Sequence, residues 1–160
     1  MTRATTSMAC GGSGVSVEQA NQTLLPLWRR IYTEFNRRME RPGLASNSAF
    51  VLLDLYIHPD RAEPLVLADS TGLPRQTMTF VLDQLERKDM LRRTPHPSDR
   101  RRRLIQITPR GTRMARDILE DIVNFESQGL AAMPPVEVSK IRAHLGQYAD
   151  ALARQNAQEN

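Results

Sequence analysis

The sequence is poor in cysteine and in long apolar runs. Cys10 is the only cysteine among the 160 residues, so an intrachain disulfide is excluded. No stretch approaches the roughly eighteen consecutive apolar residues of a membrane-spanning helix. Residues 1–16 are mostly small and polar and lack the apolar middle region of a signal peptide, so we expect a flexible leader. Together these absences predict a soluble, cytoplasmic protein.

Signatures of enzymes and of metal sites are also missing. We find no glycine-rich phosphate loop, no nucleophile motif and no paired histidine and carboxylate spacing, so we expect no enzyme. His58, His96 and His144 are too scattered to suggest a metal site, and no cofactor is expected. Cys10 lacks the apolar or basic surroundings that tune a thiolate, so an inert thiol is favoured over a redox sensor.

Positive charge is concentrated in one part of the chain. The net charge is +4, but residues 87–116 alone carry eleven basic and two acidic side chains, or +9, which leaves −5 for the remainder. A solvated basic surface is one explanation. A membrane surface would require a basic helix with an apolar face, whereas the arginine run 100–103 lies on a predicted turn and strand. Nucleic acid is therefore the favoured partner.

Apolar stripes at helical spacing run along both ends of the chain. The stripe in residues 17–40 consists of Leu24, Trp28, Ile31, Phe35 and Met39. It predicts a single helix that Pro42 and Gly43 end. Near the C-terminus, Thr108 and Pro109 begin a second predicted helix, and Pro134 and Pro135 separate it from a third. Because such faces need something to pack on, we expect self-association through the terminal helices.

The middle of the chain has the pattern of a helix-turn-helix. Residues 46–57 form a predicted buried helix, 64–70 an extended entry and a short helix closed by Gly72, and residues 74 to about 88 a further helix whose first turn begins with Pro74. Met78, Val81, Leu82 and Leu85 share one face of that last helix. In a helix-turn-helix, the second helix offers its N-terminal residues to DNA base edges.

A basic β-hairpin is predicted directly after these helices. Residues 91–94 and 103–107 are short and partly β-branched, and a Pro, Ser and Asp segment lies between them. If residues 100–103 are extended, Arg100 and Arg102 face one side and Arg101 and Arg103 the other. We expect Arg100 and Arg102 to contact phosphates or a minor groove and Arg103 to give support from the flank.

Three motifs stand out in residues 72–111: Leu85-Glu86-Arg87-Lys88, Asp99-Arg100-Arg101, and Ile107-Thr108-Pro109 followed by Gly111. Through them this part of the chain resembles the winged-helix region of the MarR family of bacterial transcription regulators. The order of elements is similar over about residues 17–155. The fold expected from the resemblance is mainly α with a small β-hairpin wing (α+β), a winged helix-turn-helix with dimerisation helices at both ends.

The resemblance implies a homodimer in which residues 17–45 and 115–155 form the dimerisation helices and residues 46–114 the DNA-binding domain. Such regulators commonly repress promoters near their own gene by binding a pseudo-palindrome, and they release DNA on binding a small, often aromatic, molecule. Others respond to cysteine oxidation. By resemblance the tip of the wing reaches a minor groove, and Asp99 pairs with Arg101 to shape the wing.

The chain departs from the family pattern at three positions. Asp89 stands where glycine usually follows the recognition helix, and aspartate tolerates the left-handed conformation better than most residues. Pro74 replaces a serine cap. Phe80 replaces a common arginine; it could pack on a thymine methyl group or fill a gap beside the hairpin.

The remaining site residues follow from helix position. The candidate base and phosphate contacts at the start of the recognition helix are Arg75, Gln76, Thr77, Thr79 and Phe80. An effector pocket lined by Trp28, Tyr32, Phe35 and Met39 is possible, although such a stripe more often makes core or dimer contacts. Asp54 could reach a ligand or an arginine, but a solvent-facing position is favoured. A sequence-independent nucleic-acid-binding protein is the competing interpretation of the charge.

Overall fold

The computed structural model describes residues 16–41, 43–99 and 102–158. The chain divides into two compact units, Met1–Arg37 and Arg38–Asn160. Most of the predicted leader, including Cys10, lies outside the described residues, as do Arg100 and Arg101. None of the helices in the described ranges is long and apolar enough to cross a membrane.

The first unit contains two helices where the sequence predicted one. Helix α1 spans Val17–Asn21, and α2 spans Leu25–Met39 and continues into the second unit. Ser16 and Gln19 form a reciprocal capping box that starts α1. Thr23 Oγ1 donates to Ala20 O (2.7 Å) and accepts from Leu25 N (3.2 Å), which ends one helix and starts the next. The prediction of a continuous helix was therefore wrong at residues 22–24.

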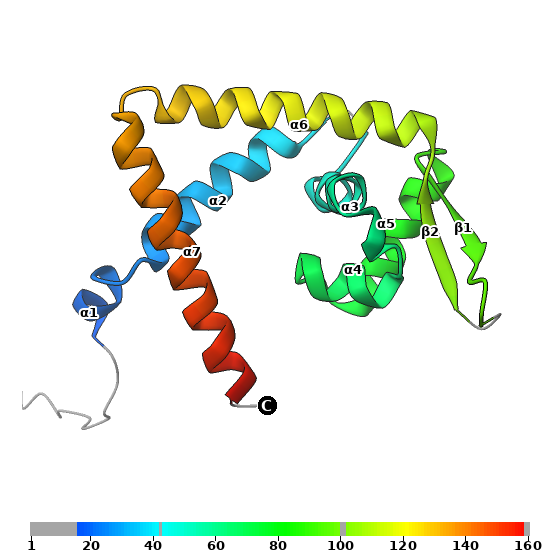
Figure 1. The fold of residues 1–160 in the computed structure, drawn as a ribbon, viewed down its shortest axis with the longest axis horizontal. Coiled ribbons are helices and arrows are strands. Elements are labelled where there is room, and N and C mark those ends of the chain that lie inside the picture. Colours follow the sequence, from blue (N-terminus) through cyan, green and yellow to red (C-terminus); the bar gives the residue numbers. More distant parts are fainter. Residues whose placement is uncertain (1–15, 42, 100–101, 159–160) are drawn as a thin grey trace, which may run out of the picture. The chain divides into compact units, whose positions relative to one another are not determined.

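The second unit contains the helix-turn-helix and hairpin in the predicted order. Its elements are α3 (Ser46–Ile57), the short 3₁₀ helix η1 (Pro59–Arg61), α4 (Pro64–Thr71), α5 (Arg75–Arg87), β1 (Leu91–Pro95), β2 (Arg103–Ile107), α6 (Pro109–Leu130) and α7 (Pro135–Gln158). Figure 1 shows α6 beginning at the base of the hairpin and passing across α3, against which it packs. Helix α3 also packs against α4 and α5, so it lies at the centre of this unit.

One apolar core holds α3, α4, α5, the hairpin and the first half of α6 together. The predicted inner face of α5 is buried, and α3 buries a face along most of its length. The largest fully buried apolar side chains are Val51, Leu52, Leu67, Met78, Leu82, Leu85, Leu91 and Ile118. Burial of such side chains contributes about 1.5–3 kcal/mol each before the entropy cost of folding. This core fixes the positions of α5 and of the hairpin base.

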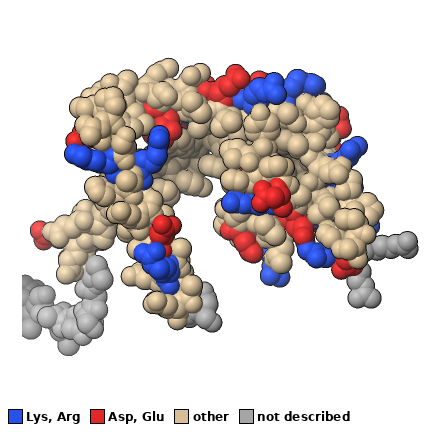
Figure 2. Space-filling model, viewed as in Figure 1, with Lys and Arg blue, Asp and Glu red and all other residues tan. Residues whose placement is uncertain are grey.

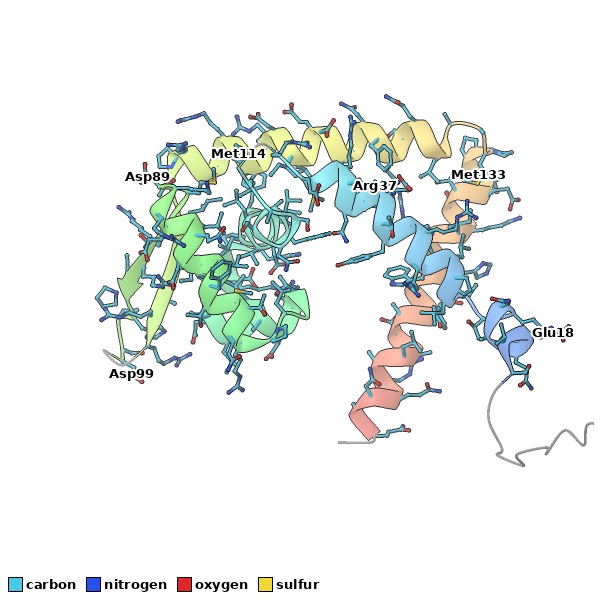
Figure 3. The ribbon with its side chains drawn as sticks, turned by 180° about the vertical axis from the view of Figure 1, so that it is seen from behind. Glu18, Arg37, Asp89, Asp99, Met114 and Met133 are labelled. Atoms are coloured by element: carbon cyan, nitrogen blue, oxygen red, sulfur yellow. The ribbon has the colours of Figure 1, made fainter. Side chains whose placement is uncertain are left out.

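The two strands pair antiparallel, with Leu91 opposite Ile107 and Pro95 opposite Arg103. Ile105 is buried, and its amide donates to Ala62 O (2.6 Å), just before α4. The hairpin is thus attached to the helices at its base. Its far end points away from the body, and Figure 3 shows Asp89 at the base and Asp99 at the tip.

Helix α7 buries none of its residues within the chain. Its apolar side chains recur at helical spacing and are exposed; they are Val136, Ile141, Leu145, Tyr148 and Leu152. In the first unit, α2 likewise exposes Leu25, Leu27, Trp28, Ile31 and Tyr32. Amphipathic faces of this kind usually pack on another surface in a stable protein.

Candidate nucleic-acid interface

The turn between α4 and α5 sets the direction of the second helix. Gly72 closes α4 in the left-handed conformation (φ 66°), and Leu73 N donates to Ala68 O (3.1 Å). Pro74 was predicted in the first turn of the next helix, but it is the N-cap, with φ −55° and ψ 145°. Its fixed φ suits the extended backbone there as well, and it offers no side-chain cap.

The first turns of α5 present the predicted contact residues to solvent. Arg75, Gln76, Thr79 and Phe80 are exposed, and Thr77 is half-buried. Thr79 Oγ1 donates to Arg75 O (3.1 Å), which leaves its methyl group and oxygen lone pairs available. Phe80 is 58% exposed, a large value for a phenylalanine, so the gap-filling alternative beside the hairpin is not realised.

The tip of the hairpin is closed by backbone hydrogen bonds. His96 N donates to Arg102 O (3.2 Å), and Arg102 N donates to Asp99 O (3.0 Å). Ser98 N also donates to His96 Nδ1 (3.2 Å), which adds a hydrogen bond to a side chain within the bend. The predicted pair of Asp99 with Arg101, and the contact role of Arg100, fall on residues outside the described part of the chain.

Arg102 joins the hairpin to the start of α4. Its Nε donates to Glu63 Oε2 (3.0 Å), and its Nη2 pairs with Glu63 Oε1. The hydrogen bonds and charge of Arg102 lower the pKa of Glu63, and Glu63 in turn raises the pKa of Arg102. The Arg102 side chain is still 50% exposed. Arg103 begins β2 and is exposed, as a flanking residue would be.

Arg93 joins the hairpin to α5. Its Nη2 pairs with Asp83 Oδ1 (2.6 Å) and its Nη1 with Glu86 Oε2, while its backbone amide donates to Glu86 Oε1 (3.1 Å). Burial opposes the charge on Arg93, but the hydrogen bonds that Arg93 donates to Asp83 and Glu86 outweigh it and raise its pKa. Arg93 was predicted only as one of the basic residues between 87 and 116. The acidic residues on the outer face of α5 were the available signal.

Thr108 and Asp89 define the junction of the hairpin and α6. Thr108 caps α6 as predicted, because its Oγ1 accepts from Gly111 N (3.1 Å). The same hydroxyl donates to Asp89 O (2.7 Å). Asp89 has φ 55°, so the aspartate that replaces the family's glycine does adopt the left-handed conformation.

Asp54 does not face solvent, so that expectation was wrong. Its side chain is 16% exposed; Arg61 Nη1 donates to Oδ1 (3.1 Å) and Ser70 Oγ to Oδ2 (2.7 Å). Asp54 thus ties α3 to η1 and α4. The η1 turn, which the sequence analysis did not predict, brings Arg61 within reach.

The four candidate pocket residues differ in burial. Met39 is 2% exposed and packs in the core of the second unit. Trp28 and Tyr32 are exposed on α2, and Phe35 is half-buried. Of the four, Met39 is therefore committed to packing. Among the residues that the structure describes, no group of three or more His, Cys, Asp or Glu side chains is placed to hold a metal.

Opposite charges adjoin over much of this unit. Figure 2 shows basic and acidic side chains side by side over α4 and along α6. Within the hairpin region, Arg93 and Arg102 each face a carboxylate. The +9 charge of residues 87–116 therefore includes cations that already have intramolecular partners.

Comparison with known proteins gives a family match over the part of the chain that contains α3, α4, α5 and β1. Residues 44–102 match the family model of the MarR family. The HTH-type transcriptional regulator MhqR of Bacillus subtilis (strain 168) is 32% identical over 94 residues, which make up 59% of this chain. The match spans 64% of that relative, slightly less than two thirds of its length.

Solved structures agree on the fold. MepR of S. aureus, in a complex with DNA, is similar with a TM-score of 0.71 and 21% identity, over 81% of this chain and 98% of that one. PcaV from Streptomyces coelicolor, in complex with its natural ligand, is similar with a TM-score of 0.67 and 23% identity, over 88% of this chain and 99% of that one. These likenesses confirm the mainly helical fold with a hairpin wing. The match over residues 44–102 thus confirms the resemblance to the MarR family that the sequence motifs indicated.

Proposed function

We propose that this protein is a sequence-specific DNA-binding transcriptional regulator of the bacterial cytoplasm, with double-stranded DNA as its partner. The observation that carries the proposal is the exposed start of α5, where Arg75, Gln76 and Thr79 stand together after the turn at Gly72. Arginine and glutamine are the side chains that pair with guanine and adenine edges in a major groove. The related fold of MepR has been solved with DNA.

The wing supplies the second part of the proposed contact. We assign Arg100, Arg101 and Arg102 to phosphates or to a minor groove, with Asp99 and Arg101 shaping the loop. Arg102 retains donors beyond its bonds to Glu63, since a guanidinium has five N–H groups. Thr77 and Phe80 complete the recognition-helix set, with Phe80 suited to a thymine methyl group.

The regulator acts as a homodimer in this proposal. Supporting it are the exposed apolar stripes on α2 and α7, which leave Trp28, Ile31, Leu145 and Tyr148 in contact with solvent in the single chain. Dimerisation through residues 17–45 and 115–155 would bury them. Two recognition helices would then read a pseudo-palindrome with half-sites about one helical turn apart.

Repression with release by a small aromatic effector is the proposed mode of control. One support is that the structure of PcaV contains its natural ligand. The other is that α2 carries three aromatic residues, Trp28, Tyr32 and Phe35, ahead of the buried Met39. Release by oxidation of Cys10 is the alternative control within the same fold. Sequence-independent binding to nucleic acid is the alternative to operator recognition.

A footprint on the DNA upstream of the protein's own gene tests the proposal. We expect protection of two half-sites that survives excess random duplex and is lost with one of a panel of aromatic acids. Loss with an oxidant, abolished by Cys10→Ser, would favour redox control instead. Uniform protection of all duplexes would exclude sequence-specific recognition, and sedimentation as a monomer at micromolar concentration would exclude the dimer.

A further inference from the structure

Arg93 differs from other arginines of the basic run in the direction of its side chain, which its position on β1 decides. It pairs with Ile105 across the hairpin, and directly opposed residues share a face of the sheet. Ile105 is 2% exposed, so this face is the one that packs on the body of the domain. The Arg93 side chain accordingly lies against α5 and is only 27% exposed.

Arg93 contacts two carboxylates that lie next to each other on the surface of α5. Asp83 and Glu86 are three residues apart and therefore neighbours on the helix surface. The guanidinium bonds to both carboxylates, and the amide of Arg93 bonds to Glu86 as well (3.1 Å). Three hydrogen bonds from a single residue thus connect β1 to the second half of the recognition helix.

The adjacent arginine provides a contrast. Arg92 is on the opposite face of β1, is exposed, and donates from Nε to the neutral side chain of Gln106 (3.0 Å) on the neighbouring strand. It carries the same charge at almost the same place, but its side-chain hydrogen bond to Gln106 stays within the hairpin. Arg92 is thus a matched control for Arg93.

We propose that Arg93 is a positioning residue that fixes the angle between the wing and the recognition helix, rather than one of the cations that contact DNA. The inference rests on the function proposed above and deepens it. By pairing with Asp83 and Glu86, Arg93 also offsets one of the two negative charges that these carboxylates place on a helix that must approach phosphates. Both effects let the wing and α5 engage one duplex together.

The proposal predicts a specific pattern in DNA binding. Arg93→Gln in the full chain lowers affinity about tenfold for a duplex that the wild-type protein selects from a random library, comparable with the loss of one base contact, because the wing and α5 no longer keep the angle that suits one duplex. The dependence of affinity on salt stays unchanged, because no phosphate contact is removed. A lost phosphate contact would instead reduce the salt slope by about one per wing.

A charge swap separates positioning from net charge. Arg93→Glu alone brings three carboxylates together, whereas Arg93→Glu combined with Glu86→Arg keeps the total charge and restores one opposite-sign pair, although the pair with Asp83 is lost. Affinity for the selected duplex should therefore recover in part relative to Arg93→Glu alone. Arg92→Gln, the matched control, changes preference for the selected duplex over random DNA less than Arg93→Gln does. A lower salt slope in Arg93→Gln, an unchanged affinity, or no recovery in the swap would each overturn the proposal.

Glu86→Gln tests the same contact from the other side if the Arg93→Gln variant fails to fold. A carboxylate does not bind phosphate, so a loss of duplex preference in this variant comes from the contact with Arg93. Hydrogen exchange supplies a readout without DNA, since Glu86→Ala should speed exchange of the Arg93 amide. Unchanged exchange would show that the contact is absent, whereas failure of the wild-type protein to select any duplex would defeat the proposed function itself.

Discussion

The backbone of Gly111 lies directly against the carbonyl group of Met90. A Cβ atom at Gly111 would be 2.0 Å from Met90 O and 2.9 Å from Ile107 Cγ1. The carbonyl cannot move aside freely, because it accepts a hydrogen bond from Thr108 N (3.1 Å). The absence of a side chain at this position therefore lets α6 begin where the hairpin ends.

Gly111→Ala should destabilise the protein by about 1–3 kcal/mol, the cost of overpacking, because backbone rather than a flexible side chain has to move. Chemical denaturation at neutral pH measures the change. Gly129→Ala, later in the same helix with nothing within 4 Å of the added methyl group, is the matched control. It should stabilise by up to about 1 kcal/mol through helix propensity. Equal stability of the two variants would contradict the close contact.

Asp89 occupies the left-handed region with φ 55°, where a β-branched side chain is strained. Asp89→Val should lower the free energy of unfolding by about 1–2 kcal/mol, whereas Asp89→Gly should leave it equal or higher. Thermal unfolding of the two variants provides the comparison. If valine were tolerated as well as glycine, the positive φ would not persist in solution.

How far the sequence predicted the fold depended on whether local signals decided each element. Thr108 and Pro109 marked the start of α6 correctly because capping is settled within one turn. The break between α1 and α2 was missed although its signal was local too. Thr23 ends one helix and begins another, but the apolar stripe that continues across it favoured a single helix.

The ion pairs of the site could not be predicted in the same way. Arg93 and Glu86 belong to different elements, and the packing of the hairpin on α5 decides whether they meet. Strand parity divides residues between two faces but does not say which face is inward. The buried Ile105 supplies that information, and only the folded core determines it.

Glu63 should make stability depend on pH. The hydrogen bonds and charge of Arg102 lower the pKa of Glu63 in the folded protein, so folding favours the ionised carboxylate. This contribution is present above the ordinary pKa of a glutamate and is lost as the pH falls through the lowered value in the folded state. Glu63→Gln should therefore be less stable than the wild-type protein at neutral pH, and the difference should shrink on acidification.

Denaturant midpoints for the wild-type protein and Glu63→Gln, measured at several pH values, test this dependence. Glu126→Gln, which removes an exposed carboxylate from α6, is the control for the loss of surface charge. Asp121 also has a lowered pKa, from Arg41 and Arg38 against the opposing effect of burial, but it is common to all variants and cancels. A difference that stays constant with pH would argue against the pair of Glu63 with Arg102.

Gln76 allows the proposed base readout to be tested against general attraction to DNA. Its side chain is neutral and exposed in the first turn of α5, so its removal leaves the positive charge that attracts phosphates unchanged. Gln76→Ala should cost about 1–3 kcal/mol of affinity on the selected duplex, the value of one good base contact, and little on random duplex. Gln128→Ala, an exposed helical glutamine on α6, should change neither. Binding curves on both duplexes distinguish the interpretations, since equal losses for Gln76→Ala would mean that α5 holds DNA without reading its sequence.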